Sequence, residues 1–311
     1  MHVLIPFAST LSETSRQTFR QLNLPHLSQL LTRLTPGKPI GGDEQRLSMP
    51  YETALARIYG WEVDDDGCLP WGARLAAQDG IPVKNEAWGL LSPVHFHLGA
   101  DHVTLADPQA LRLSAQESHT LFETVKPLFE SEGWTVAWGG PMRWYAAHDS
   151  LDGLPTASLD RVIGRNIQLW MPTAQQANLV RRLQNEVQML LYQQPLNDHR
   201  VGLGALPVNS FWLSGCGRPQ RAKQPADLKV ELSLREHALA RDWPAWAQAW
   251  KALDAGPLRE LLERSKRHEA VGLTLCGDRV AQTFSPEARG LWARLSGGLR
   301  AASPAPLLEV L

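Results

Sequence analysis

The spacing of apolar residues changes twice along this chain of 311 residues, and that change limits the folds that the chain can adopt. The first part opens with a short apolar run at residues 2–6, which is typical of a buried strand. Helical apolar spacing follows at residues 25–34 and 50–59. From residue 86 onward the segments instead have the character of strands separated by turns.

The last third of the chain returns to alternating helices and strands. Helices are predicted at residues 243–253 and 257–266, a buried strand at 270–276, and a final helix at 284–299. This order of elements predicts the α/β class, in which a core sheet carries helices on both faces and is interrupted by a smaller inserted α+β domain.

We place the domain boundaries where the spacing of apolar residues changes from one pattern to the other. The discontinuous core is expected to comprise residues 1–90 and 207–311, and the inserted domain residues 91–206. Within the insert, Ser114 and Glu117 fit a capping box, in which each side chain bonds the backbone of the other at the start of a helix.

The composition excludes several classes of function. A formal net charge of −1 provides no basic surface for nucleic acid. Three scattered cysteines, outside any CxxC spacing, indicate a reducing compartment and no zinc ribbon. No apolar run approaches the ~20 residues that a membrane helix requires. We therefore expect a cytoplasmic protein with no membrane and no nucleic-acid partner.

Residues 195–219 are the most informative segment. Their pattern predicts a helix exit at Pro195, a short strand at residues 211–213, and a turn at Gly215 and Gly217. A strand that ends in a glycine turn is a common ligand site in α/β proteins. The alternative is that both glycines only supply the backbone conformation of a tight turn.

Two resemblances follow from these residues. The segments YAAHDS, LPTASLDRVIGRN, RRLQNEVQMLLY and PVNSFWLSGCG together resemble the Rpf E-type regulatory proteins of proteobacteria, a family tied to the control of pathogenicity factors. Residues 195–219 also resemble a signature of archaeal-type cofactor-independent phosphoglycerate mutases. The matching positions are Pro195, Asn197, Arg200, Gly204, Pro207, Asn209, Trp212, Gly215, Gly217 and Pro219.

The second resemblance implies a fold and a chemistry. Those mutases belong to the alkaline-phosphatase-like superfamily, with a metal-bearing α/β core and a smaller inserted substrate domain. The chain departs from their pattern at the metal ligands. An Asp-Gly pair is expected after the first strand, where this chain has Phe7, and a histidine is expected after Asp278. The nucleophilic serine is matched only loosely, by Ser48.

These departures predict a degenerate scaffold. Two divalent ions in a phosphotransfer site need several converging anionic or imidazole ligands. No cofactor is therefore predicted. The only candidate ligands for a divalent metal are His95, His97, Asp101 and His102. Two histidines at alternate positions of a strand point to one face, which suits a metal ion. The other interpretation of the cluster is a polar strand edge with surface histidines.

A second group of residues suggests an anion pocket, because arginine forks match phosphate and carboxylate groups. The alternative is a set of salt bridges between a loop and a helix. The candidate ligand-binding residues are Arg143, Tyr145, His148, Arg161, Arg165, Arg200 and Asn209.

Three functions follow as expectations. The first is a non-catalytic regulatory protein that binds a small phosphorylated or carboxylated metabolite on a mutase-like scaffold. The second is an active cofactor-independent phosphoglycerate mutase or phosphatase with rearranged metal ligands. The third is a protein–protein adaptor, suggested by the twelve tryptophans, although tryptophans 243, 246 and 250 have the helical spacing of a core face.

Overall fold

The structure is a computed structural model that describes residues 1–62, 64–223, 225–286 and 311. The chain divides into two compact units. The first unit comprises Met1–Gln45, Met49–Gly60 and Ala222–Leu311, and the second comprises Arg46–Ser48 and Trp61–Arg221. Most of the helix predicted at residues 284–299 lies outside the described residues, and its first two residues belong to a strand.

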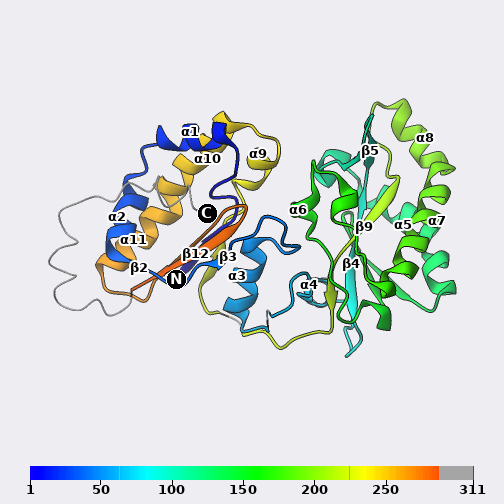
Figure 1. Cartoon of the computed structure of the whole chain (residues 1–311), viewed down its shortest axis with the longest axis horizontal. Helices are drawn as coiled ribbons and strands as arrows, with labels where there is room; N and C mark the ends of the chain where they lie inside the picture. Colours follow the sequence, from blue (N-terminus) through cyan, green and yellow to red (C-terminus); the bar gives the residue numbers. More distant parts are fainter. Residues whose placement is uncertain (63, 224, 287–310) are drawn as a thin grey trace. The chain divides into compact units, whose positions relative to one another are not determined.

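The first unit contains a mixed sheet in the order β10-β1-β11-β12-β2, with β3 also paired to β12 (Figure 1). Strand β1 is parallel to β10 and β11, whereas β12 runs antiparallel to β11. The strands are β1 (His2–Ile5), β2 (Thr35–Pro36), β3 (Ile40–Gly41), β10 (Leu228–Val230), β11 (Gly272–Cys276) and β12 (Val280–Ser285). The helices are α1 (Glu13–Arg20), α2 (Pro25–Arg33), α3 (Pro50–Tyr59), α9 (Arg235–Leu239), α10 (Trp243–Leu253) and α11 (Arg259–Lys266).

Side chains on β1 alternate between the two faces of this sheet, as the strand period requires. Val3 and Ile5 belong to the large cluster under α1, α2, α10 and α11, whereas Leu4 packs with Ala54 of α3 on the opposite face. Helices thus cover both faces. The predicted α/β class, with a sheet between helices, is confirmed.

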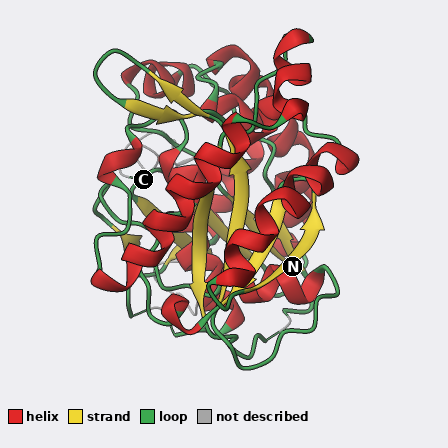
Figure 2. Cartoon of the chain, turned by 90° about the vertical axis from the view of Figure 1, so that its right-hand side faces the viewer, coloured by secondary structure: helices red, strands yellow, loops and turns green. Residues whose placement is uncertain are grey.

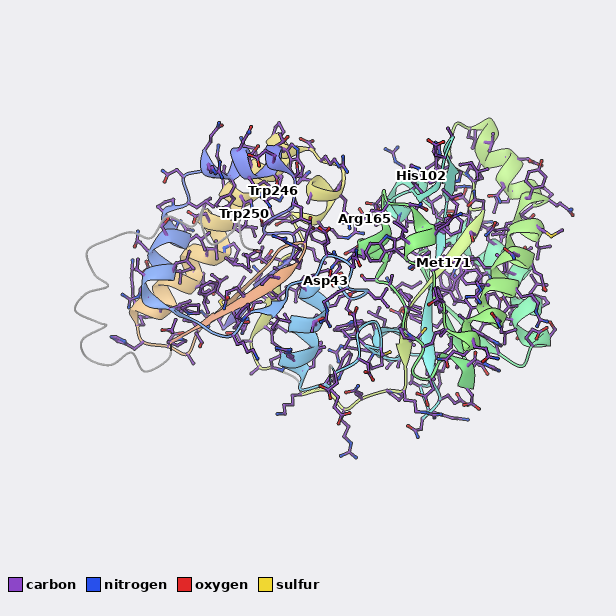
Figure 3. The ribbon with its side chains drawn as sticks, viewed as in Figure 1. Asp43, His102, Arg165, Met171, Trp246 and Trp250 are labelled. Carbon is purple, nitrogen blue, oxygen red and sulfur yellow. The ribbon has the colours of Figure 1, made fainter. Side chains whose placement is uncertain are left out.

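The tryptophans of α10 lie in the core. Trp246 and Trp250 are fully buried and pack edge-on against each other and against Phe19 of α1 (Figure 3). A π-helical turn, Asp254–Leu258, links α10 to α11. It directs the buried Asp254 carboxylate at the start of α2, where it accepts the backbone N–H of Leu27 at 2.8 Å. This contact caps α2 from a distant part of the chain.

The second unit is built on an antiparallel sheet in the order β7-β8-β4-β9. Figure 2 views it from the side of α7 and α8. A separate two-stranded sheet consists of β5 and β6. The strands are β4 (Trp88–Val94), β5 (Phe96–Leu98), β6 (Val103–Leu105), β7 (Thr135–Gly140), β8 (Arg143–Ala147) and β9 (Ser210–Gly217). The helices are α4 (Trp71–Gln78), α5 (Ala115–Ser131), α6 (Leu159–Val162), α7 (Asn178–Tyr192) and α8 (Pro195–Gly202).

Helices cover both faces of this sheet as well. Leu91 and Trp144 pack with α5 and α7, whereas Trp88 and Tyr145 pack with the alanines of α4. The capping box at the start of α5 is present, with Glu117 N–H donating to Ser114 Oγ at 3.2 Å and Ser114 N–H donating to Glu117 Oε2 at 2.9 Å.

Strand β9 differs from its prediction in extent and in placement. It continues through Gly215 to Gly217 instead of turning there, and it pairs with β4 in the second unit. Glycine is required at 215 because a Cβ atom would lie 2.9 Å from Trp71 Cβ and because its φ is +63°. Residues 61–90 and 207–221, which the sequence places in the core, therefore belong to the second unit.

The start of residues 195–219 also differs from expectation. Pro195 begins helix α8 instead of ending a helix. Proline suits the first helical position because its fixed φ matches the helix and its missing N–H would have no partner there. Among the described residues, no helix has both the length and the apolar character needed to cross a membrane.

Candidate functional site

The carboxyl ends of β1 and β11 lie side by side in the first unit, where open α/β sheets usually hold ligands. Phe7 follows β1 with a φ of +56° and is 3 % exposed. Its carbonyl accepts Trp246 Nε1–H at 3.1 Å, and its ring lies 5.9 Å from the ring of Tyr51. This edge is therefore filled by an aromatic side chain that has no metal-binding atom.

The end of β11 carries a thiol and a carboxylate. Burial raises the pKa of the Cys276 thiol, which disfavours the thiolate that would bind a metal. Asp278 accepts the backbone N–H of Leu11 at 3.0 Å through Oδ2. Across the described ranges, no three His, Cys, Asp or Glu side chains are grouped so that they could hold a metal ion.

Ser48, the candidate nucleophile, lies two residues before α3 and is 6 % exposed. Its hydroxyl accepts the backbone N–H of Gly67 at 3.0 Å, and its own N–H donates to Asp66 Oδ1 at 3.1 Å. An activated serine needs a base or a metal beside its oxygen. The contact observed at this oxygen instead joins two backbone segments of the second unit.

The histidine cluster lies on the β5–β6 hairpin. His95 Nδ1 is 2.9 Å from the carbonyl of Pro207, and the rings of His95 and His97 are 5.9 Å apart. His97, Asp101 and His102 are exposed (Figure 3 labels His102). The pair on alternate positions is thus present, but among the residues that the structure describes no third ligand joins it, as a zinc site requires.

Arg143 and Tyr145 are brought together by Asp79, which ends α4. Asp79 accepts Arg143 Nε–H at 2.8 Å and Nη2–H at 3.0 Å, and it accepts the Tyr145 hydroxyl at 2.6 Å. The hydrogen bond from Arg143 lowers the pKa of Asp79 against the opposing effect of burial. Gly139 is packed against this cluster, because a Cβ atom there would lie 2.6 Å from Asp79 Oδ2.

Replacing Asp79 by Asn is expected to destabilise the second unit by about 1–2 kcal/mol, because the bidentate pair to Arg143 is lost. The folded-state pKa of Asp79 is depressed, so its stabilisation is present above its ordinary value of 3.8 and is lost as the pH falls below it. Urea unfolding at pH 7 and pH 3 measures both effects. Equal stability of the wild type and Asp79→Asn at pH 7 would contradict the expectation.

Arg200 and Asn209 are held by contacts within the second unit. Arg200 is 2 % exposed, and it donates to Glu117 Oε1 at 2.6 Å and to the carbonyls of Leu111 and Leu206. Burial disfavours ionisation of Glu117, but hydrogen bonds from Ser114 and Arg200 outweigh it and lower the pKa of that carboxyl.

The Asn209 amide completes the edge of β5. It accepts Phe96 N–H at 2.7 Å and donates to the Phe96 carbonyl at 2.9 Å. Asn197 likewise bonds both backbone groups of Val208. These asparagines therefore bond backbone groups within the second unit.

The remaining candidate residues lie in separate contacts. Arg161 is buried and donates to the Ser48 carbonyl at 3.4 Å, and the Arg165 guanidinium lies 5.8 Å from the centre of the Trp170 ring. His148 stacks on Trp134 with ring centroids 5.0 Å apart. The structure therefore joins Arg143 with Tyr145 through Asp79, while the other five candidates each have their own partners. The anion pocket as a whole stays a prediction.

The sequence did not single out Asp79, and it used Glu117 only as a helix cap. Asp79 is 64 residues from Arg143 and Glu117 is 83 residues from Arg200. No spacing rule links residues so far apart, so only the presence of unmatched arginines hinted that carboxylate partners existed.

A scan against models of protein families gives no match, and no curated protein matches the chain. Solved structures that are similar to it include two at low sequence identity. One is a cofactor-independent phosphoglycerate mutase from Thermoplasma acidophilum DSM 1728, with 16 % identity, a TM-score of 0.40, and coverage of 100 % of this chain and 98 % of the mutase. The other is the PH0037 protein from Pyrococcus horikoshii, with 12 % identity, a TM-score of 0.47, and coverage of 99 % and 96 %.

Proposed function

We propose that this chain is a non-catalytic regulatory protein that binds a small phosphorylated or carboxylated metabolite on a mutase-like scaffold. The observation that carries the proposal is Phe7. The mutase-like pattern requires a metal-binding aspartate at this place, and a buried phenyl ring offers a divalent cation no oxygen or nitrogen.

Two further contacts support the proposal. The Ser48 hydroxyl is bonded to the backbone of Gly67, and the Asp278 carboxylate is bonded to the backbone of Leu11. The Ser48 hydroxyl and the Asp278 carboxylate therefore each stabilise the backbone of a loop. A phosphoserine mechanism without a metal would leave the serine unactivated and the transferring charge unneutralised.

The test compares wild type with Ser48→Ala in an assay of 2- and 3-phosphoglycerate interconversion after growth with divalent metals. We expect no turnover above the background in either protein, and saturable binding of a phosphorylated metabolite in calorimetry without its conversion. Stoichiometric metal together with turnover that Ser48→Ala abolishes would instead establish the alternative, an active mutase or phosphatase.

An adaptor role is a second candidate because exposed apolar side chains are concentrated in one part of the second unit. Seven large hydrophobic residues are exposed in the described chain, and four of them lie between residues 189 and 203 on α7 and α8 and directly after α8. They are Met189, Tyr192, Val201 and Leu203. Exposed apolar groups of this kind mark interaction surfaces. Loss of a cellular partner in Met189→Glu/Tyr192→Glu, but not in Asn185→Glu, would support this role.

A further inference from the structure

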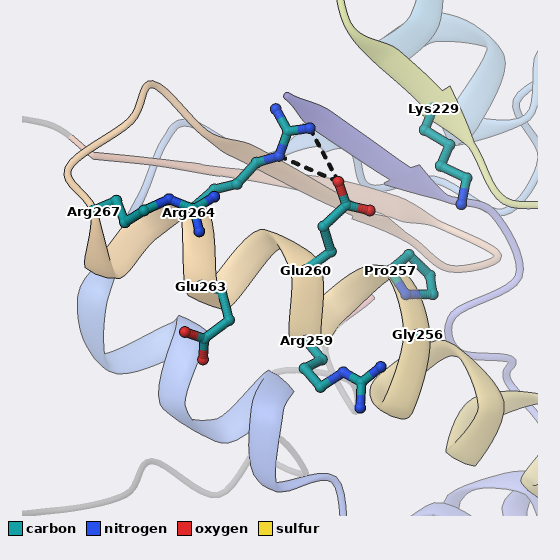
Figure 4. A pocket seen from close by; sticks show the side chains of 8 residues that line it. All are labelled: Lys229, Gly256, Pro257, Arg259, Glu260, Glu263, Arg264 and Arg267. Atoms are coloured by element: carbon teal, nitrogen blue, oxygen red, sulfur yellow. Dashed lines mark hydrogen bonds and ion pairs between the residues drawn. The ribbon is translucent and has the colours of Figure 1, made fainter.

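A hollow of about 640 Å³, lined mostly by charged residues, lies in the first unit beside α11. Its volume is in the range of small-molecule sites. Three elements contribute to it, namely β10, the π-helical turn and α11 (Figure 4). The lining residues are Lys229, Gly256, Pro257, Arg259, Glu260, Glu263, Arg264 and Arg267. Single π-helical turns occur often at functional sites.

Four cationic and two acidic side chains line the hollow. Carboxylates just outside the lining pair with three of the cations, Arg264 with Asp227, Lys229 with Glu231 and Arg267 with Glu269. Arg264 and Glu260 form a fixed pair in the centre, with Nη2 and Oε1 3.0 Å apart (Figure 4). Arg264 is also 2.9 Å from Asp227 Oδ2. Hydrogen bonding to Glu260 raises the pKa of Arg264. Glu260 and Arg264 thus compensate each other's charge within the protein.

The end of the hollow beside the π-helical turn differs from the centre. Arg259 is exposed, and within the described ranges its side chain has no hydrogen bond or ion pair. None of its five N–H donors is therefore used in a contact within the described ranges. Lys229, from β10, bonds Glu231 at 2.7 Å, and in the part of the chain that the structure describes its other two donors have no partner. Apart from the helix's own backbone, a Cβ atom at Gly256 would meet no atom within 4 Å, so the space beside the turn is open.

We propose that the hollow binds a small phosphorylated molecule, with Arg259 and Lys229 holding its phosphate group beside Gly256 and Pro257. A phosphate group carries nearly two negative charges and several acceptor oxygens. It therefore matches two cations from separate elements better than a ligand with a single carboxylate would. The inference rests on the proposed function, because it locates the metabolite site of the regulatory protein. It assigns the site to the first unit, whereas the arginines of the anion pocket expected from the sequence belong to the second unit.

Calorimetry with inorganic pyrophosphate as the probe tests the site. We expect saturable binding that weakens with added salt. Arg259→Ala and Lys229→Ala should each weaken it about tenfold, because each removes a charge-assisted contact. Glu263→Gln should strengthen it, because it removes a negative charge from the lining. Arg57→Ala is the matched control, since it removes an exposed helical arginine elsewhere in the first unit and should leave the affinity unchanged.

The outcomes distinguish the phosphate site in the hollow from the proposed regulatory function. Absence of saturable binding, or equal affinity in wild type and Arg259→Ala, overturns the site in the hollow. Binding that persists in Arg259→Ala leaves the regulatory proposal standing with its ligand elsewhere. Metal-dependent turnover of phosphoglycerates overturns the regulatory proposal whatever the effect of Arg259→Ala. Circular dichroism of each variant establishes that it is folded before the titration.

Discussion

Arg200→Ala is expected to lower the free energy of unfolding by about 3–4 kcal/mol, because it removes a buried cation from a carboxylate and two carbonyls. The Arg200 side chain is almost fully buried and is 2.6 Å from Glu117. Its removal leaves the Leu111 and Leu206 carbonyls without their guanidinium donors. Denaturant unfolding followed by tryptophan fluorescence measures the change.

The matched control is Arg182→Ala on α7. Arg182 also pairs with glutamates, but about half of its side chain is exposed. Its loss should cost at most about 1 kcal/mol, because water and salt weaken surface ion pairs. If Arg200→Ala were as mild as the control, Arg200 would be free to contact a ligand, and the ligand-binding role that its sequence context suggests would gain support over the structural one.

Acid is expected to destabilise the first unit through His2 as the pH falls from 6.5 to about 4. Burial lowers the pKa of His2 from 6.5 to about 4, with a smaller contribution from the nearby amino terminus. His2 Nε2 lies 2.8 Å from Thr274 Oγ1, and a Cβ atom on Gly272 would lie 2.6 Å from His2 Nδ1. The imidazole is therefore closely packed and partly shielded from water, which favours its neutral form over its charged form.

The direction of the pH effect follows from proton linkage. Between pH 6.5 and about 4 the unfolded chain binds a proton at His2 and the folded chain does not. The free energy of unfolding therefore decreases as the pH is lowered through this window, by about 3 kcal/mol at its lower end. Unfolding curves from pH 7 to pH 4 should show this loss in the wild type and a smaller loss in His2→Gln. Parallel losses in both proteins would rule out His2 as the cause.

Most local elements could be predicted from the sequence. Helix α3 has the predicted bounds, because a proline at its first position and Gly60 at its end mark both termini. The Ser114–Glu117 capping box marks the start of α5 in the same way. These signals act within a few residues, where the geometry of the helix fixes which groups meet.

Strand β9 and the candidate site show what local pattern could not predict. The glycines at 215 and 217 predict a turn, but Gly215 lies within strand β9, which pairs with β4. A Cβ atom at Gly215 would lie 2.9 Å from Trp71 Cβ of α4. The sequence predicts that Arg143 binds an anionic ligand, but in the structure its guanidinium is paired with Asp79. The partner of each is distant along the chain, and its approach depends on how helices pack on the sheet.

The sequence by itself determined the α/β class, the order of most elements and the absence of an acidic ligand at Phe7, because each depends on residue type and short-range spacing. The tertiary structure alone decided that β9 joins the second unit and that Asp79 and Glu117 engage the arginines. It also decided that Lys229 and Arg259 line one hollow. Pairing between distant segments is selected by burial and by the satisfaction of buried polar groups, and these are properties of the whole packed chain.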